Sequence, residues 1–137
     1  MQESTHVGVS IDRPWREVYA YAADPVNLPQ WAAGLAGATV ERVEGVWTTD
    51  SPMGRVTVAF AAPNDHGVLD HDVTLPSGET VANPVRVFPN GEGCDVVFTV
   101  RRRPGMSEED LARDAGAVAA DLATLRRILE GGDRPSG

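Results

Sequence analysis

The sequence predicts one α+β domain, in which a meander of short antiparallel strands is followed by a long C-terminal helix. Residues 38–103 form short runs rich in Val and Thr, interrupted by Gly, Pro, Asn and Asp, as in strands joined by tight turns. Residues 107–129 carry apolar side chains three and four positions apart, the spacing of an amphipathic helix. The length of 137 residues fits one domain, which we place at 1–130, with a loose Gly- and Pro-rich tail at 131–137.

The N-terminal segment predicts a strand followed by two short helices. Val7, Val9 and Ile11 alternate with small or polar residues, which indicates a half-buried strand. Asp12 and Pro14 suit the start of a helix, and this helix must end near Asp24, because a residue before proline avoids helical angles. Asp24 and Pro25 then repeat the same start signal for a second helix that runs toward Trp31.

Six further strands complete the predicted sheet. They lie near 38–44, 46–49, 54–61, 67–75, 79–88 and 93–102. The loops between them are too short for parallel crossovers, so we expect antiparallel neighbours. With the first strand they form a seven-stranded curved antiparallel sheet.

The turn Pro76–Ser77–Gly78 predicts the register of one hairpin. Proline suits the first turn position and glycine the left-handed third one, which gives a three-residue loop with a bulge. In this register His71 lies opposite Asn83. The inner face then carries Leu69, His71, Val73, Leu75, Val81, Asn83, Val85 and Val87. Two polar side chains therefore lie on an otherwise apolar surface.

The last helix has the clearest start and the clearest apolar side. Ser107 and Asp110 have the spacing of a capping box, and Met106 and Leu111 that of a hydrophobic staple. One stripe then contains Leu111, Ala115, Val118, Leu122, Leu125 and Leu129. A long helix with one apolar side needs a surface to cover, and the sheet is the only candidate.

This order of elements resembles the helix-grip fold of the START-like (SRPBCC) superfamily, especially its bacterial polyketide cyclase/dehydrase-like branch. The segments that carry the resemblance are IDRPWREV (Ile11–Val18), DPVNLPQW (Asp24–Trp31) and DLATL (Asp121–Leu125). The resemblance implies a sheet that grips the last helix around a hydrophobic cavity. It also implies binding or carriage of a lipid, polyketide or aromatic molecule, or alternatively a cyclase or aromatase activity in the same cavity.

The inward-facing polar residues and the tryptophans are the candidate site. His71 could bind a ligand or move a proton near neutral pH, with Asn83 steadying a developing oxyanion. The alternative is a core histidine satisfied by Asn83 or by water. Trp31 and Trp47 could stack on a planar ligand at the cavity entrance or belong to the core. Leu69, Val73, Val85 and Phe98 are the expected apolar wall.

Composition and spacing argue against several other functions. The chain has 20 acidic residues and 12 basic ones, all Arg, for a net charge of -8, which disfavours nucleic acid and anionic membranes. Arg101–Arg103 is therefore expected to be a solvated strand end. No apolar stretch suggests a signal peptide or membrane insertion, so we expect a cytoplasmic protein.

We expect neither a metal nor another cofactor. In the run Asp65–Asp72, strand alternation sends His71 inward while Asp70 and Asp72 point outward, so the potential ligands do not converge. The single cysteine, Cys94, cannot form an internal disulfide and is expected to be an inert core thiol.

Overall fold

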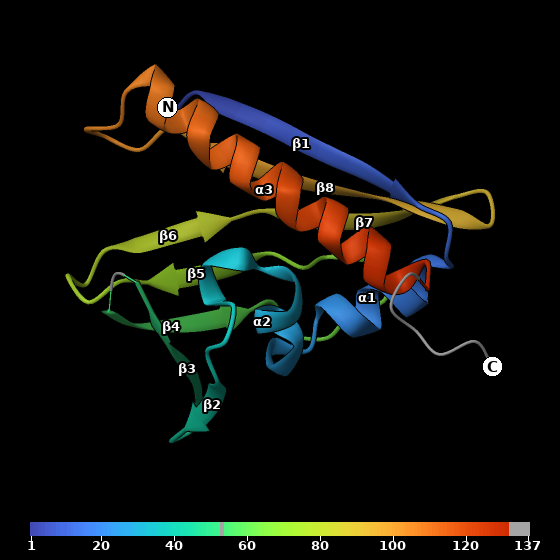
Figure 1. Ribbon diagram of the computed structural model, residues 1–137, viewed down its shortest axis with the longest axis horizontal. Coiled ribbons are helices and arrows are strands. Elements are labelled where there is room, and N and C mark those ends of the chain that lie inside the picture. The colour runs from blue at the N-terminus through green and yellow to red at the C-terminus, as the bar shows by residue number, and fades with distance from the viewer. Residues whose placement is uncertain (53, 132–137) are drawn as a thin grey trace.

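The computed structural model describes residues 1–52 and 54–131. In it, the first predicted strand is an edge strand of a three-stranded antiparallel sheet (Figure 1). Strand β1 (Ser4–Ile11) pairs along its whole length with β8 (Gly93–Arg101), and β8 pairs on its other side with β7 (Val85–Asn90). The order is β1-β8-β7. Alternate residues of β1, from Thr5 to Ile11, face the protein interior, as the sequence pattern predicts.

The two short helices that follow β1 are present. Helix α1 (Trp15–Ala22) buries Val18 and Ala22 and ends before Asp24, as expected. The side chain of Asp24 then accepts a hydrogen bond from the Val26 amide at the start of the 3-10 helix η1 (Pro25–Asn27). Helix α2 (Leu28–Trp31) and the 3-10 helix η2 (Ala33–Leu35) complete this segment.

The remaining strands form a second, five-stranded antiparallel sheet (Figure 1). Its strands, in order along both the chain and the sheet, are β2 (Val40–Val43), β3 (Val46–Ser51), β4 (Gly54–Phe60), β5 (His71–Thr74) and β6 (Thr80–Asn83). The predicted register of the β5–β6 hairpin is confirmed, because His71 pairs with Asn83. Gly78 has a φ of 91°, the left-handed conformation that the predicted turn requires.

The prediction of one seven-stranded sheet is wrong at Pro84, although the α+β class and the antiparallel order are correct. The expected strand 79–88 divides there into β6, which pairs only with β5, and β7, which pairs with β8. Proline has no amide hydrogen and cannot continue a ladder on both sides, so the chain changes sheets at this residue. The expected strand 67–75 is also shorter, because only a single bridge between Val68 and Arg86 precedes β5.

Helix α3 (Glu108–Leu129) runs along the three-stranded sheet and packs mainly on β1 and β8 (Figure 1). The predicted capping box is confirmed, since the Ser107 hydroxyl accepts from the Asp110 amide and the Asp110 carboxylate accepts from the Ser107 amide. Gly131 follows with a φ of 93°, while residues 132–137 of the predicted tail lie outside the described residues.

The core lies between α3, the short helices and the inner faces of both sheets. Its buried members are Ile11, Val18, Ala22, Leu28, Trp31, Val40, Val58, Leu69, Val85, Val87, Cys94, Val96, Leu122, Leu125 and Leu129. None of the helices in the described part of the chain has the length and the apolar run needed to span a bilayer.

Candidate functional site

A cavity of about 400 Å³ lies where the two sheets separate. One wall is β6, the opposite wall is the C-terminal end of β8, and the N-terminal half of α3 covers it. Its lining consists of Gln2, Glu79, Thr80, Val81, Ala82, Asn83, Phe98, Val100, Arg101, Arg103, Pro104, Asp114, Ala117 and Val118. We call this cavity the slot. Five consecutive residues, 79–83, line it, so residues of both faces of β6 lie around it.

Pro84 is the reason why this slot exists. The Thr99 amide donates to the Pro84 carbonyl at 2.9 Å, and in the residues that the structure describes no ladder joins β6 to β8 beyond this bond. The register of the β5–β6 hairpin directs the backbone groups of Thr80 and Ala82 away from β5 and toward the slot. These groups need water or a ligand as partners.

The slot has an apolar inner part and a charged mouth. The inner part is formed by Val81, Phe98, Val100 and Val118, which are buried or half-buried. At the mouth, the Arg103 guanidinium donates to the Glu79 carboxylate at 3.1 Å, which connects the β8–α3 loop to the start of β6.

Two of the sequence-predicted site residues, Asn83 and Phe98, line this cavity. Asn83 is half-buried, and its amide nitrogen donates only a long bond of 3.4 Å to the Val81 carbonyl. Its amide group therefore keeps hydrogen-bonding capacity for a ligand. Phe98 projects from β8, where it is opposite Val7 on one side and Val85 on the other.

His71 lies behind this wall, between two aromatic rings, and is not among the lining residues. It stacks on Phe60 with ring centroids 4.9 Å apart and meets Phe98 edge-on at 5.9 Å. Its Nδ1 lies 3.1 Å from the Leu69 carbonyl oxygen. Because a carbonyl can only accept, Nδ1 carries the hydrogen, and Nε2 holds the lone pair of the neutral ring.

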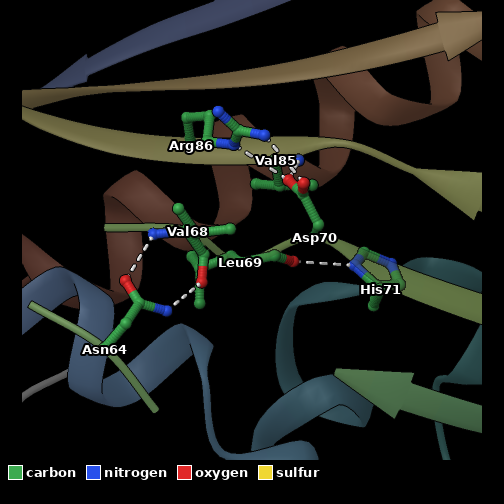
Figure 2. Close-up of polar contacts among 7 residues, drawn as sticks. All are labelled: Asn64, Val68, Leu69, Asp70, His71, Val85 and Arg86. Atoms are coloured by element: carbon green, nitrogen blue, oxygen red, sulfur yellow. Dashed lines mark hydrogen bonds and ion pairs between the residues drawn. The ribbon is translucent and has the colours of Figure 1, made fainter. Parts of the chain in front are cut away.

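The Leu69 carbonyl is free to accept from His71 because a side chain replaces it in the ladder. The Leu69 amide donates to the Val85 carbonyl, as expected for a paired strand, but the Val85 amide donates to Asp70 Oδ1 at 2.9 Å instead of returning to Leu69. Asp70 also accepts two hydrogen bonds from Arg86, at 3.0 and 2.8 Å (Figure 2). The contacts with Arg86 are the main cause of the lowered pKa of Asp70.

Asn64 fixes the loop that leads to this exchange. Its side-chain oxygen accepts from the Val68 amide at 3.1 Å, and its side-chain nitrogen donates to the Val68 carbonyl at 3.0 Å (Figure 2). The backbone amide and carbonyl of Val68 are therefore both bonded to the Asn64 side chain instead of to a neighbouring strand. This explains why β5 begins only at His71.

Burial lowers the pKa of His71, although the bond to Leu69 and the charges of Asp70 and Asp72 act in the opposite direction. The ring is therefore neutral at pH 7. No hydrogen bond joins the side chains of His71 and Asn83 within the described residues, so the two do not form the polar pair that their register suggests. The position of His71 thus matches the core interpretation more closely than that of a catalytic base in contact with substrate.

The other predicted wall residues are not among the lining residues of the cavity. Trp31, Leu69 and Val85 are buried in the core, whereas Trp47 and Val73 pack against it and stay half-buried. Trp31 has a buried indole N–H without a hydrogen-bond partner in the described structure. Trp47 receives the Arg42 guanidinium over its ring at 5.8 Å. Their roles as ligand contacts remain predictions.

No group of three or more His, Cys, Asp or Glu side chains in residues 1–52 and 54–131 is arranged to hold a metal ion. Asp65 and Asp70 are instead paired with Arg16 and Arg86. Cys94 is buried in the core, and burial, with a smaller effect of Asp95, raises the pKa of its thiol to about 11. A thiol with this pKa is protonated and unreactive at pH 7.

Most of the lining residues were not predicted as site residues from the sequence, among them Arg101, Arg103, Ala117 and Val118. Val118 was assigned to the apolar stripe of the last helix, and the arginines to a solvated strand end. The signal that could have found some of them is Pro84, because a proline inside a predicted strand indicates a break in the sheet. The C-terminal end of the adjacent strand β8, with Val100 and Arg101, lies beside that break.

The comparison with protein families identifies this architecture. Residues 2–130 match the family described as polyketide cyclase / dehydrase and lipid transport. The chain belongs to this family. This finding confirms the resemblance that the sequence suggested. A search of curated proteins gives no match.

Solved structures with this fold are similar to the chain at low sequence identity. XoxI from Bacillus cereus has a TM-score of 0.72 at 16% identity, with 91% of this chain and 94% of that one covered. CalU16 from Micromonospora echinospora has a TM-score of 0.67 at 16% identity, with 98% and 78% covered. DynU16, from the dynemicin biosynthetic locus, has a TM-score of 0.69 at 18% identity, with 94% of this chain covered. The match spans 48% of DynU16, about half of its length.

Proposed function

We propose that the protein binds a small, mostly apolar molecule in the slot between β6, β8 and α3. The observation that carries this proposal is the cavity of about 400 Å³, whose inner part is apolar. It also contains the side-chain amide of Asn83, which keeps hydrogen-bonding capacity for a ligand. Pockets for small molecules are typically about 300–1,000 Å³ and combine apolar walls with few polar groups. Membership of a family described partly by lipid transport supports the same interpretation.

The geometry favours binding over catalysis. A cyclase or aromatase, the alternative function, needs an acid or base within reach of the bound molecule. His71 does not line the slot, although its neighbours Phe98 and Asn83 do, and its Nδ1 already donates to a backbone carbonyl. The titratable groups that do line the slot, Glu79, Arg101, Arg103 and Asp114, lie at its mouth.

A pair of matched variants on α3 tests the proposed site. Ala117 and Ala119 are both exposed on the same helix, but only Ala117 is among the residues that line the slot. We expect Ala117→Phe to fill the slot and to weaken binding of an environment-sensitive apolar fluorophore by about tenfold, whereas Ala119→Phe leaves it unchanged. The measurement is a fluorescence titration of each variant. Equal binding by both variants, or no saturable binding by the unmodified protein, would contradict the proposal.

A further inference from the structure

The mouth of the slot carries an arrangement of charges that the binding of a purely apolar molecule does not require. Two guanidinium groups, those of Arg101 and Arg103, and two carboxylates, those of Glu79 and Asp114, are lining residues. The arginines come from the end of β8 and the residues just after it, next to the apolar Val100. Positive groups and apolar wall are therefore adjacent along one strand.

Arg103 shows that this mouth accommodates a carboxylate. Its guanidinium is paired with the Glu79 carboxylate at 3.1 Å, and the two side chains are 32% and 50% exposed. An ion pair this exposed contributes little stability, about 0–1 kcal/mol, so another carboxylate can replace Glu79 at little cost. The protein's own glutamate thus occupies a position that an acidic ligand could take.

Arg101 adds a second cation that no acidic side chain in the described part of the chain neutralises. Its guanidinium has five donors in a planar fork that suits both oxygens of a carboxylate. Asp114, on the α3 side of the mouth, is the one lining acid without an ion pair in that same part of the chain. An anionic headgroup at this mouth can therefore accept hydrogen bonds from two guanidinium groups, one of which can bind both of its oxygens.

From this arrangement we infer that the ligand is an amphiphile with a carboxylate at one end. Its carboxylate binds Arg101 and Arg103 at the mouth, and its apolar chain lies between Val81, Phe98 and Val118. This inference rests on the proposed function and adds the chemical class of the ligand.

Three ligands with the same ten-carbon chain, decanoate, decanol and decylamine, distinguish the contribution of the headgroup to binding from that of the chain. Each is titrated at pH 7.5 against a protein-bound apolar fluorophore, and its dissociation constant is obtained from displacement. We expect decanoate to bind about tenfold more tightly than decanol, because charge-assisted hydrogen bonds to arginine are stronger than neutral ones. We expect decylamine to bind more weakly than decanoate.

Variants of the mouth test the assigned residues. Arg101→Gln combined with Arg103→Gln is expected to remove the advantage of decanoate over decanol. Glu79→Gln is expected to strengthen decanoate binding severalfold, because it removes the competing carboxylate. Arg113→Gln is the control, since Arg113 is exposed on α3 next to Asp114 but does not line the slot.

The outcomes distinguish this inference from the proposed function. Equal affinities for decanoate and decanol, preference for decylamine, or a carboxylate preference that survives the double substitution would overturn the inference, while decanol binding would still support an apolar site. If none of the three ligands displaces the fluorophore and the fluorophore does not bind in the slot, both proposals are wrong.

Discussion

Removing the Asp70 side chain should destabilise the protein through one backbone amide. In Asp70→Ala the Val85 amide loses its acceptor, and Val85 is only 3% exposed, so the amide is left buried and unpaired. This costs about 1–3 kcal/mol. The ion pair with Arg86 adds about 0.2–1 kcal/mol, because Arg86 is 54% exposed. The expected loss in free energy of unfolding is therefore about 1–4 kcal/mol.

Two further variants separate the hydrogen bond from the charge. Asp70→Asn keeps a side-chain oxygen as acceptor and loses only the charge, so we expect a loss below about 1 kcal/mol. Asp72→Ala, at an exposed position two residues on, should change stability by no more than about 0.5 kcal/mol. Urea unfolding followed by circular dichroism measures all three. A loss for Asp70→Ala no larger than that for Asp70→Asn would refute the assigned role of the Val85 amide.

The pH dependence follows from the lowered pKa of Asp70. A carboxylate whose pKa is lower in the folded state contributes stability above the unfolded value, and this contribution is lost as the pH falls through the folded value. The advantage of the unmodified protein over Asp70→Asn should therefore be full at pH 7 and should shrink below about pH 4. A stability difference between the two proteins that stays the same from pH 7 to pH 3 would contradict a contribution from the charge of Asp70.

Three other substitutions test features of the fold. His71→Phe should lower the free energy of unfolding by about 1–2 kcal/mol at pH 7.5, because it removes the hydrogen bond to a backbone carbonyl. The loss should be smaller at pH 5. Below about pH 6.5 the imidazole binds a proton more readily in the unfolded chain than in the folded one, so His71 itself destabilises the folded state there. Gly67→Ala should unfold the protein or cost more than about 3 kcal/mol, since Gly67 has a φ of 71° and a Cβ there would lie 1.9 Å from the Val87 carbonyl oxygen. Ser107→Ala should cost about 1 kcal/mol by removing the cap of α3.

Urea unfolding also checks these variants, each against a specific comparison. Gly116→Ala is the control for Gly67→Ala, because Gly116 lies within α3 with nothing near its missing Cβ, and we expect it to stabilise by about 0.5–1 kcal/mol. A pH-independent effect of His71→Phe would contradict the depressed pKa of the imidazole. A neutral Gly67→Ala would show that the contact with Val87 relaxes freely, and a neutral Ser107→Ala would show that water replaces the cap.

The sequence was sufficient to predict the elements and one register because local signals determine them. The turn Pro76–Ser77–Gly78 places its glycine where the backbone needs a positive φ, and this fixed His71 opposite Asn83. The start of α3 was likewise predictable from Ser107 and Asp110. Such features depend on residues close together in the chain.

The site was harder to predict because it depends on where two sheets separate. Strand alternation placed Asn83 and Phe98 on the inner face, and both line the slot. It could not show that the His71 ring would donate to the Leu69 carbonyl, or that Asp70 would accept from the Val85 amide in place of that carbonyl. That exchange depends on contacts across different segments, which hydrophobic periodicity does not encode. The same limit applies to Trp31, whose core position results from packing of distant elements.

The discontinuity at Pro84 also determines how easily the molecule can widen. Strand β6 has a ladder on one edge only. In the described residues, the Thr99–Pro84 hydrogen bond lies just after β6, and the Arg103–Glu79 ion pair lies just before it. Widening the gap between β6 and β8 therefore breaks no ladder between these two strands, in contrast to prying apart β7 and β8. For the ligand site proposed above, the wall therefore has a line along which it can widen without loss of a strand ladder.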